Sequence, residues 1–177
     1  NASLLLSAAK LYGTYAGGFV VDGDRVKRLS DRSFAYAKRG ICARDDAFCR
    51  QFDDKDFDRF NAFVVEHIGP DDIDAVYILA TSWVGWLRAD SADFDRVADL
   101  PRIEALLNRV DALSPAHDHG NVLAYLGVLD CLRPESLGGR PARGQQRLAA
   151  ADAVDAGKNL LPKVLNSEYC ARLLFDQ

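Results

Sequence analysis

Residues 71–88 read DDIDAVYILATSWVGWLR, and this stretch indicates most clearly which kind of fold the chain adopts. Its apolar side chains recur every three or four residues, the spacing that places them on one side of an α-helix. Two aspartates open the stretch, where carboxylates accept hydrogen bonds from the first turn of a helix. The sequence therefore predicts a helix from Asp71 to about Arg88.

A second stretch, residues 121–132, repeats one detail of the first. The tripeptide Trp83-Val84-Gly85 aligns with Tyr125-Leu126-Gly127, and 127 − 85 = 42 gives the offset between them. Each glycine follows an aromatic residue by two positions. Because a glycine has no side chain, it lets a neighbouring helix approach closely. We therefore predict that Gly85 and Gly127 are points of close helix contact in two helical hairpins.

Helical spacing continues through the rest of the chain. Further helices are predicted over 4–21, 26–40, a short segment between 40 and 71, 93–113, 141–156 and from 160 onward. Pro101 either kinks its helix or divides it. No segment alternates apolar and polar residues for long, so no sheet is predicted. The predicted fold class is all-α: stacked antiparallel helical hairpins in one domain over residues 1–177, forming a tetratricopeptide-like α-solenoid, with an irregular helical bundle as the alternative.

The composition excludes several classes of protein. The chain has 177 residues, 49% of them hydrophobic, which is enough for a packed interior and excludes general disorder. Its 22 basic and 26 acidic side chains give a net charge of −4, which argues against binding nucleic acid. The apolar runs are too short to cross a bilayer. Because methionine is absent and the last helix has no cap, we expect the chain to be truncated at both ends.

No group of residues predicts catalysis or a bound metal. His117-Asp118-His119 is the only close cluster of ligand-type side chains, and it lacks a third and fourth ligand from elsewhere. No serine lies in a Gly-x-Ser-x-Gly setting. The aspartates at 53, 54, 56 and 58 lack the glycine and glutamate of a calcium-binding loop and are interpreted as a solvated face. We expect no enzyme activity and no cofactor.

Aromatic side chains are the best candidates for a binding surface. In solenoids of helical hairpins the first helix of each pair lines the concave side, and aromatic groups there can bind a partner or ligand. Core packing is the alternative for each of them. Trp83 and Trp86 are three positions apart and cannot both point fully into one interhelical seam, so Trp86 and Arg88 are expected to face outward. The candidates are Tyr77, Trp83, Trp86, Arg88 and Tyr125.

Several strings together resemble one known family. They are LYGTYAGGFV at 11–20, DRVKRLSDR at 24–32, WVGW at 83–86, AYLG at 124–127, LGGRP at 137–141, GKNLLPKV at 157–164 and EYCAR at 168–172. These strings are similar to the T component of TRAP transporters, called TatT, and the resemblance covers essentially the whole chain. The motifs are glycines, caps and core aromatics, and none of them specifies a reaction.

The resemblance implies a periplasmic lipoprotein built of tetratricopeptide-like helices. Such a protein would serve a TRAP transport system by docking its solute-binding P component, and we expect it to form a homo-oligomer. A carrier for a small hydrophobic ligand is the alternative function. The cysteine that would carry the lipid is not in this chain, so membrane attachment is expected only through an anchor outside it.

The four cysteines bear on the compartment. Cys42 and Cys49 are seven positions apart in a polar stretch, and either a loop-closing disulfide or two reduced thiols fit that spacing. The periplasm implied by the resemblance favours the disulfide. Cys131 and Cys170 lie on different predicted helices, where a disulfide is possible but free thiols packed in the core are favoured.

Overall fold

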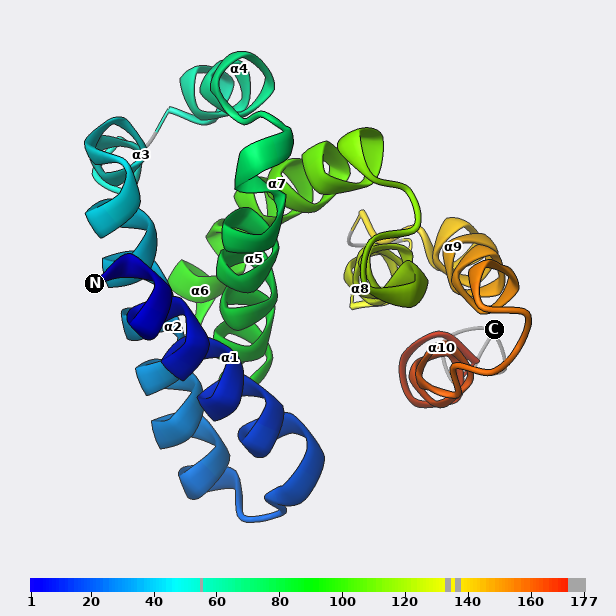
Figure 1. Ribbon diagram of the computed structural model, residues 1–177. Helices are drawn as coiled ribbons and strands as arrows, with labels where there is room; N and C mark the ends of the chain where they lie inside the picture. The colour runs from blue at the N-terminus through cyan, green and yellow to red at the C-terminus, as the bar shows by residue number, and fades with distance from the viewer. Residues whose placement is uncertain (55, 133–134, 136–137, 172–177) are drawn as a thin grey trace. The chain divides into compact units, whose positions relative to one another are not determined.

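The computed structural model describes residues 1–54, 56–132, 135 and 138–171 (Figure 1). Those residues form helices and connecting segments and no strand, so the predicted all-α class is confirmed. The chain forms two compact units, Asn1–Leu106 (unit 1) and Leu107–Gln177 (unit 2). Stacking of the hairpins into a solenoid, and a single domain over the whole chain, stay predictions.

Unit 1 is built from an antiparallel pair of helices and a third helix packed against both (Figure 1). Its elements are α1 (Ala2–Phe19), α2 (Gly23–Arg44), α3 (Asp46–Gln51), α4 (Phe57–His67), a 3₁₀ turn (Pro70–Asp72), α5 (Ile73–Arg88), α6 (Phe94–Ala98) and the beginning of α7 (Leu100–Leu113). Aspartates cap several of these helices: the carboxylates of Asp22, Asp45, Asp56 and Asp93 each accept a hydrogen bond from a first-turn amide.

Small residues let α1, α2 and α5 pack closely. The hydroxyl of Ser33 donates to the Ala9 carbonyl at 2.8 Å and lies 3.1 Å from the Ser82 hydroxyl, so one buried side chain joins all three helices. A Cβ at Gly40 would meet the Leu6 side chain at 2.8 Å. Unit 1 is thus held by close backbone approach as well as by apolar burial.

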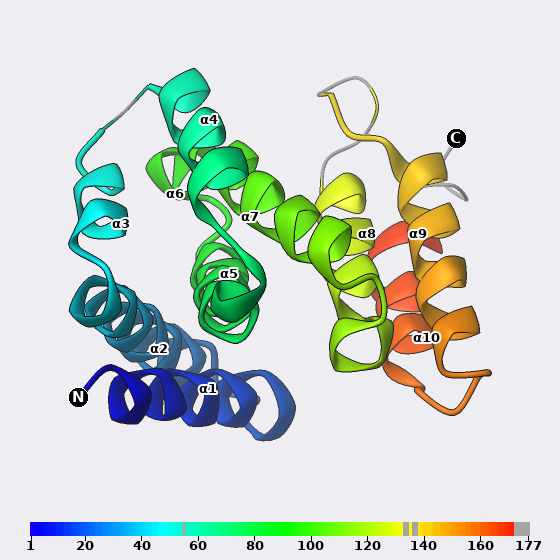
Figure 2. The same ribbon diagram turned by 45° about the horizontal axis from the view of Figure 1, so that its top comes forward.

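Unit 2 is a helical hairpin closed by a third short helix (Figure 2). After a 3₁₀ turn at His117–Gly120 come α8 (Asn121–Cys131), α9 (Pro141–Val154), α10 (Leu161–Leu165) and a π-helical stretch (Asn166–Ala171). Their apolar core contains Ala124, Val128, Leu148, Ala151 and Leu165. Only part of the predicted final helix is α-helical, and its residues 172–177 lie outside the described residues.

The two glycines of the predicted repeat differ. A Cβ at Gly127 would lie 2.8 Å from Leu148 Cγ and 2.9 Å from the Gly144 carbonyl oxygen, which confirms close contact between α8 and α9. A Cβ at Gly85 would meet nothing within 4 Å, so the prediction of a close contact there is wrong. Gly85 is half buried but faces open space instead of a neighbouring helix.

The helix boundaries correct one further prediction and decide a second. The region between residues 40 and 71 holds two helices, α3 and α4, rather than one, because both Asp45 and Asp56 begin a helix. Of the two outcomes predicted for the 93–113 segment, a kink or a division, the structure shows a division into α6 and α7 at Asp99. Pro101 therefore lies in the first turn of α7, where its missing amide hydrogen costs no intrahelical bond.

Two disulfides are present. Cys42 and Cys49 pair across the junction of α2 and α3, with a Cα–Cα distance of 4.6 Å, as predicted. Cys131 and Cys170 also pair, with a Cα–Cα distance of 5.1 Å, so the expectation of free thiols there is wrong. The π-helical stretch packs against α8 and brings the two buried sulfurs together, a contact that separation along the chain could not indicate.

Candidate functional site

The predicted aromatic residues of α5 lie at different depths. Trp83 is 1% exposed and Tyr77 is buried, so both belong to the interior of unit 1. Trp83 stacks on Phe34 with ring centroids 5.0 Å apart and contacts Phe52 at 5.8 Å. Buried rings of this kind supply apolar area to the core. Neither side chain presents an open face.

Trp86 and Arg88, which were expected to face outward, are half buried. The guanidinium carbon of Arg96 lies 4.2 Å from the centre of a Trp86 ring, and Phe34 lies against Trp86 as well. Tyr125 is half buried on α8, in unit 2. The structure thus places four of the five candidates on α5, and a binding role for them stays a prediction.

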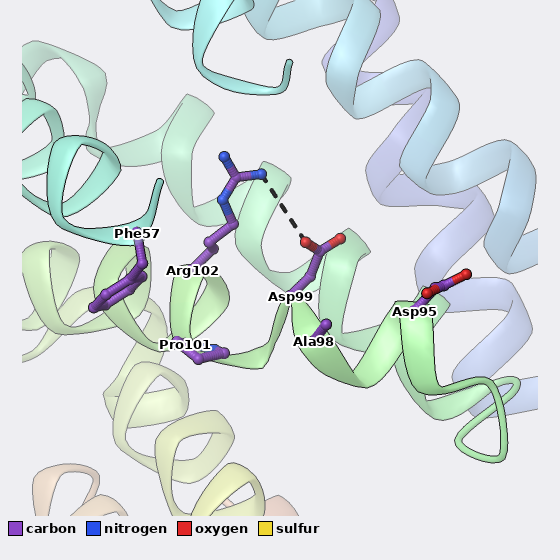
Figure 3. Close-up of a pocket in the computed structure, with 6 residues that line it drawn as sticks. All are labelled: Phe57, Asp95, Ala98, Asp99, Pro101 and Arg102. Atoms are coloured by element: carbon purple, nitrogen blue, oxygen red, sulfur yellow. Dashed lines mark ion pairs between the residues drawn. The ribbon is translucent and has the colours of Figure 1, made fainter. Parts of the chain in front are cut away.

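A pocket of about 590 Å³ lies on unit 1 (Figure 3). Residues of α4, α6 and α7, with the link between the last two, form its lining, which is apolar at one side and acidic at the other. The lining residues are Phe57, Asp95, Ala98, Asp99, Pro101 and Arg102. None of them was a candidate from the sequence.

Arg102 is a buried residue of the pocket lining. Its side chain is 7% exposed, and its guanidinium donates to the carbonyl oxygens of Gln51, at 2.7 Å, and of Asp54. It also lies 4.0 Å from the Asp99 carboxylate, the pair marked in Figure 3. The Phe60 ring lies under the guanidinium at 4.6 Å. Arg102 therefore ties α7 to the segment between α3 and α4.

Asp54, whose carbonyl oxygen accepts a hydrogen bond from Arg102, also forms an ion pair at the surface through its carboxylate. Arg59 donates to both Asp54 oxygens at 2.8 Å, a paired geometry that suits guanidinium and carboxylate. The Arg59 hydrogen bonds, with a further bond from the Asp56 amide, lower the pKa of Asp54 to about 2. Asp54 is therefore ionised throughout the physiological pH range, which keeps this segment acidic.

The sequence contains a repeated motif that points to this pocket and that helical spacing does not reveal. The tetrapeptide Asp-Phe-Asp-Arg occurs twice, at residues 56–59 and 93–96. In both copies the first aspartate caps a helix and the phenylalanine begins it. Residues of both copies, Phe57 and Asp95, line the pocket. The prediction that the aspartates of the first copy form a solvated face does not take this repeat into account.

Unit 2 contains a polar cluster of a different kind. The Asp130 side chain is 1% exposed and accepts hydrogen bonds from Arg143 and Arg147, each with one contact at 2.9 Å, while Arg140 lies 3.3 Å away. These arginines belong to the start of α9 and the residue before it. The cluster joins α8 to α9, since a buried carboxylate needs such partners.

The described residues provide no evidence for metal chemistry or a membrane span. Within residues 1–54, 56–132, 135 and 138–171, no three histidine, cysteine or acidic side chains are placed to hold a metal ion. No helix among those residues is long and apolar enough to cross a bilayer.

These features define a class of protein: paired antiparallel helices, tied by two disulfides, with a surface pocket. The sequence model of the TRAP transporter T-component family matches residues 1–177, and the chain belongs to this family. It is a family of transporter components and not an enzyme family. No curated protein matches the chain.

Proposed function

We propose that this protein is a non-enzymatic accessory component of a TRAP transport system, which acts in the periplasm by docking the solute-binding P component. The family match over residues 1–177 carries the proposal. The two disulfides support an oxidising compartment, because paired cysteines seldom persist in the reducing cytosol. In this proposal a lipid anchors the full-length protein to the membrane.

The proposal is tested by direct binding. The purified solute-binding protein of the same TRAP system is titrated into this chain, and calorimetry measures the dissociation constant with and without transported solute. We expect saturable binding. Absence of binding in both conditions would overturn the docking function. The chain treated with reductant is the companion sample, because loss of binding after reduction would tie the docking fold to an oxidising compartment.

Self-association belongs to the same proposal. Large apolar side chains on α1 are exposed, among them Leu4 at 71%, Leu11 at 71% and Phe19 at 75%. Exposed apolar residues gathered on one helix are typical of surfaces that contact another protein. We expect a homo-oligomer, and sedimentation equilibrium measures it. A monomer at all concentrations would contradict this part of the proposal.

A carrier for a small hydrophobic ligand is not proposed, because no observation favours it. The pocket on unit 1 has two carboxylates and a guanidinium in its lining, whereas sites for apolar ligands are mostly apolar. Native mass spectrometry of gently purified protein would reveal a ligand bound at one-to-one occupancy.

A further inference from the structure

The two Asp-Phe-Asp-Arg segments expose aromatic rings at neighbouring helix starts. Phe57 is 42% exposed and Phe94 is 88% exposed. Each ring follows an aspartate whose carboxylate accepts the amide of the following arginine, at 3.0 Å from Arg59 and 3.4 Å from Arg96. The cap thus fixes the helix start and leaves the phenylalanine at the surface. Of the two rings, Phe57 lines the pocket. Exposed aromatic rings are typical of contact surfaces.

Both segments are acidic. Residues 53–59 contain four aspartates against one lysine and one arginine, and residues 90–102 contain four aspartates against two arginines. Each segment therefore has a net charge of −2, and together they equal the net charge of −4 of the whole chain.

The basic side chains of the second segment point inward. The side chains of Arg96 and Arg102 are 8% and 7% exposed. Arg96 donates to the Trp86 carbonyl oxygen at 2.7 Å and to Asp31 at 3.2 Å, and Arg102 donates to the carbonyl oxygen of Gln51. At the first segment, Arg59 is exposed but is paired with Asp54. These cations are therefore directed to groups within the protein.

Two of the carboxylates, by contrast, remain at the surface without an ion pair to any described residue. Asp58 and Asp95 are exposed, and among the described residues no cation lies within ion-pair distance of either. Asp95 lines the pocket with Asp99, while Phe57, Ala98 and Pro101 supply its apolar wall (Figure 3). A lysine or arginine side chain fits this combination, because its methylene stem packs on apolar groups while its charged end pairs with carboxylates.

We propose that this pocket, together with the exposed Phe57 and Phe94 rings, is the docking surface for a basic segment of the solute-binding partner. Charge complementarity carries the choice of occupant: the acidic excess and the inward arginines favour a lysine- or arginine-bearing peptide. The exposed rings add cation–π contacts to its cationic groups. This inference rests on the proposed function and names the surface that performs it.

Two pairs of substitutions test the surface, and each has a matched control in unit 1. The test variants are Asp58→Lys with Asp95→Lys, and Phe57→Ala with Phe94→Ala. Asp24→Lys is the charge control, because Asp24 is also an exposed aspartate in the first turn of a helix. Val21→Ala is the apolar control, because Val21 is 99% exposed and lies outside α1. Circular dichroism verifies that each variant keeps the helical fold.

The readout is the dissociation constant for the purified solute-binding protein, measured at low and at physiological salt. We expect the charge-reversal pair to weaken binding at least tenfold and to reduce its salt dependence, the phenylalanine pair to weaken it severalfold, and both controls to stay within twofold. If the wild-type chain binds and the test variants bind equally well, the docking surface is wrong while the docking function stands. If the wild-type chain does not bind, both fail.

Discussion

In unit 1 the buried charges are guanidinium groups, whereas in unit 2 the buried charge is a carboxylate. Arg96 and Arg102 direct their donors to backbone carbonyl oxygens and to aspartates at the surface. Asp130 instead lies among arginines supplied from the start of α9. The first arrangement ties helix ends together around an aromatic core, and the second joins two helices through one carboxylate.

The difference follows from how much apolar material each unit can bury. Unit 1 has a cluster of stacked rings that includes Phe34, Phe48, Phe52 and Trp83. Unit 2 has a smaller core, made largely of alanine, valine and leucine side chains. A small unit gains less from burial and depends more on covalent and ionic ties. Unit 2 is therefore expected to be more sensitive to the loss of single polar or covalent links.

The largest effect is expected at Asp130. Asp130→Ala leaves the guanidinium groups of Arg143 and Arg147 without the carboxylate that they contact, so we expect unit 2 to lose about 3–5 kcal/mol of unfolding free energy. Urea unfolding followed by circular dichroism measures the loss. Asp54→Ala, which removes a surface carboxylate from unit 1, is the control and should cost much less, because solvent screens its pair with Arg59. Equal losses would remove the contrast between the units.

The two disulfides give the next comparison. In the chain-entropy model, opening the Cys131–Cys170 loop costs about 4 kcal/mol and opening the shorter Cys42–Cys49 loop about 2–3 kcal/mol. Replacing each pair by alanine and comparing melting temperatures tests this order. The sulfurs of unit 2 are buried whereas Cys42 and Cys49 are half buried, so mild reductant should open the Cys42–Cys49 bond first. The opposite order of reduction would contradict the burial of Cys170.

Alanine at the two glycines should have effects of opposite sign. Gly127→Ala forces α8 from the Gly144 carbonyl oxygen, and we expect a loss of about 1–3 kcal/mol. Gly85→Ala meets nothing and replaces a poor helix former, so we expect a gain of up to about 1 kcal/mol. The midpoint of urea unfolding measures both. A loss at Gly85 would restore the close contact that the sequence predicted. A single cooperative transition in either urea unfolding curve would support the prediction of one domain over residues 1–177.

The smallest effects concern two aspartates whose pKa values move in opposite directions. The hydrogen bonds from Arg59 lower the pKa of Asp54 to about 2, whereas burial raises the pKa of Asp111 against an opposing effect of Arg147. The Asp54 contribution to stability is therefore present above its unfolded pKa of about 4 and is lost as the pH falls toward 2. The Asp111 contribution is present below about pH 4 and is lost as the pH rises through its folded pKa.

Carbon-13 titration of the two carboxyl groups checks these directions. Arg59→Ala should return the pKa of Asp54 toward its ordinary value while leaving that of Asp111 unchanged. Arg25→Ala, which removes an arginine elsewhere in unit 1, is the control and should move neither. An Asp54 carboxyl that titrates near pH 4 in the wild-type chain would show that the pair with Arg59 is not maintained in solution.

The sequence by itself determined the helical class, the approximate bounds of several helices and the family. Helical spacing and capping aspartates are local properties, readable within about five residues, and so α5, α8 and α9 were predicted close to their observed bounds. The seven-residue spacing of Cys42 and Cys49 allowed a disulfide, and the periplasm implied by the family resemblance favoured it.

Only the tertiary structure decided which side chains meet across helices. Gly85 and Gly127 have the same sequence context, but one faces open space and the other a neighbouring backbone. Cys131 and Cys170 are 39 residues apart, and their pairing depends on how the π-helical stretch packs on α8. The pocket likewise needs Phe57 and Asp95 brought together from separate helices. Local spacing fixes the face of a helix, whereas the partner of that face depends on packing throughout the unit.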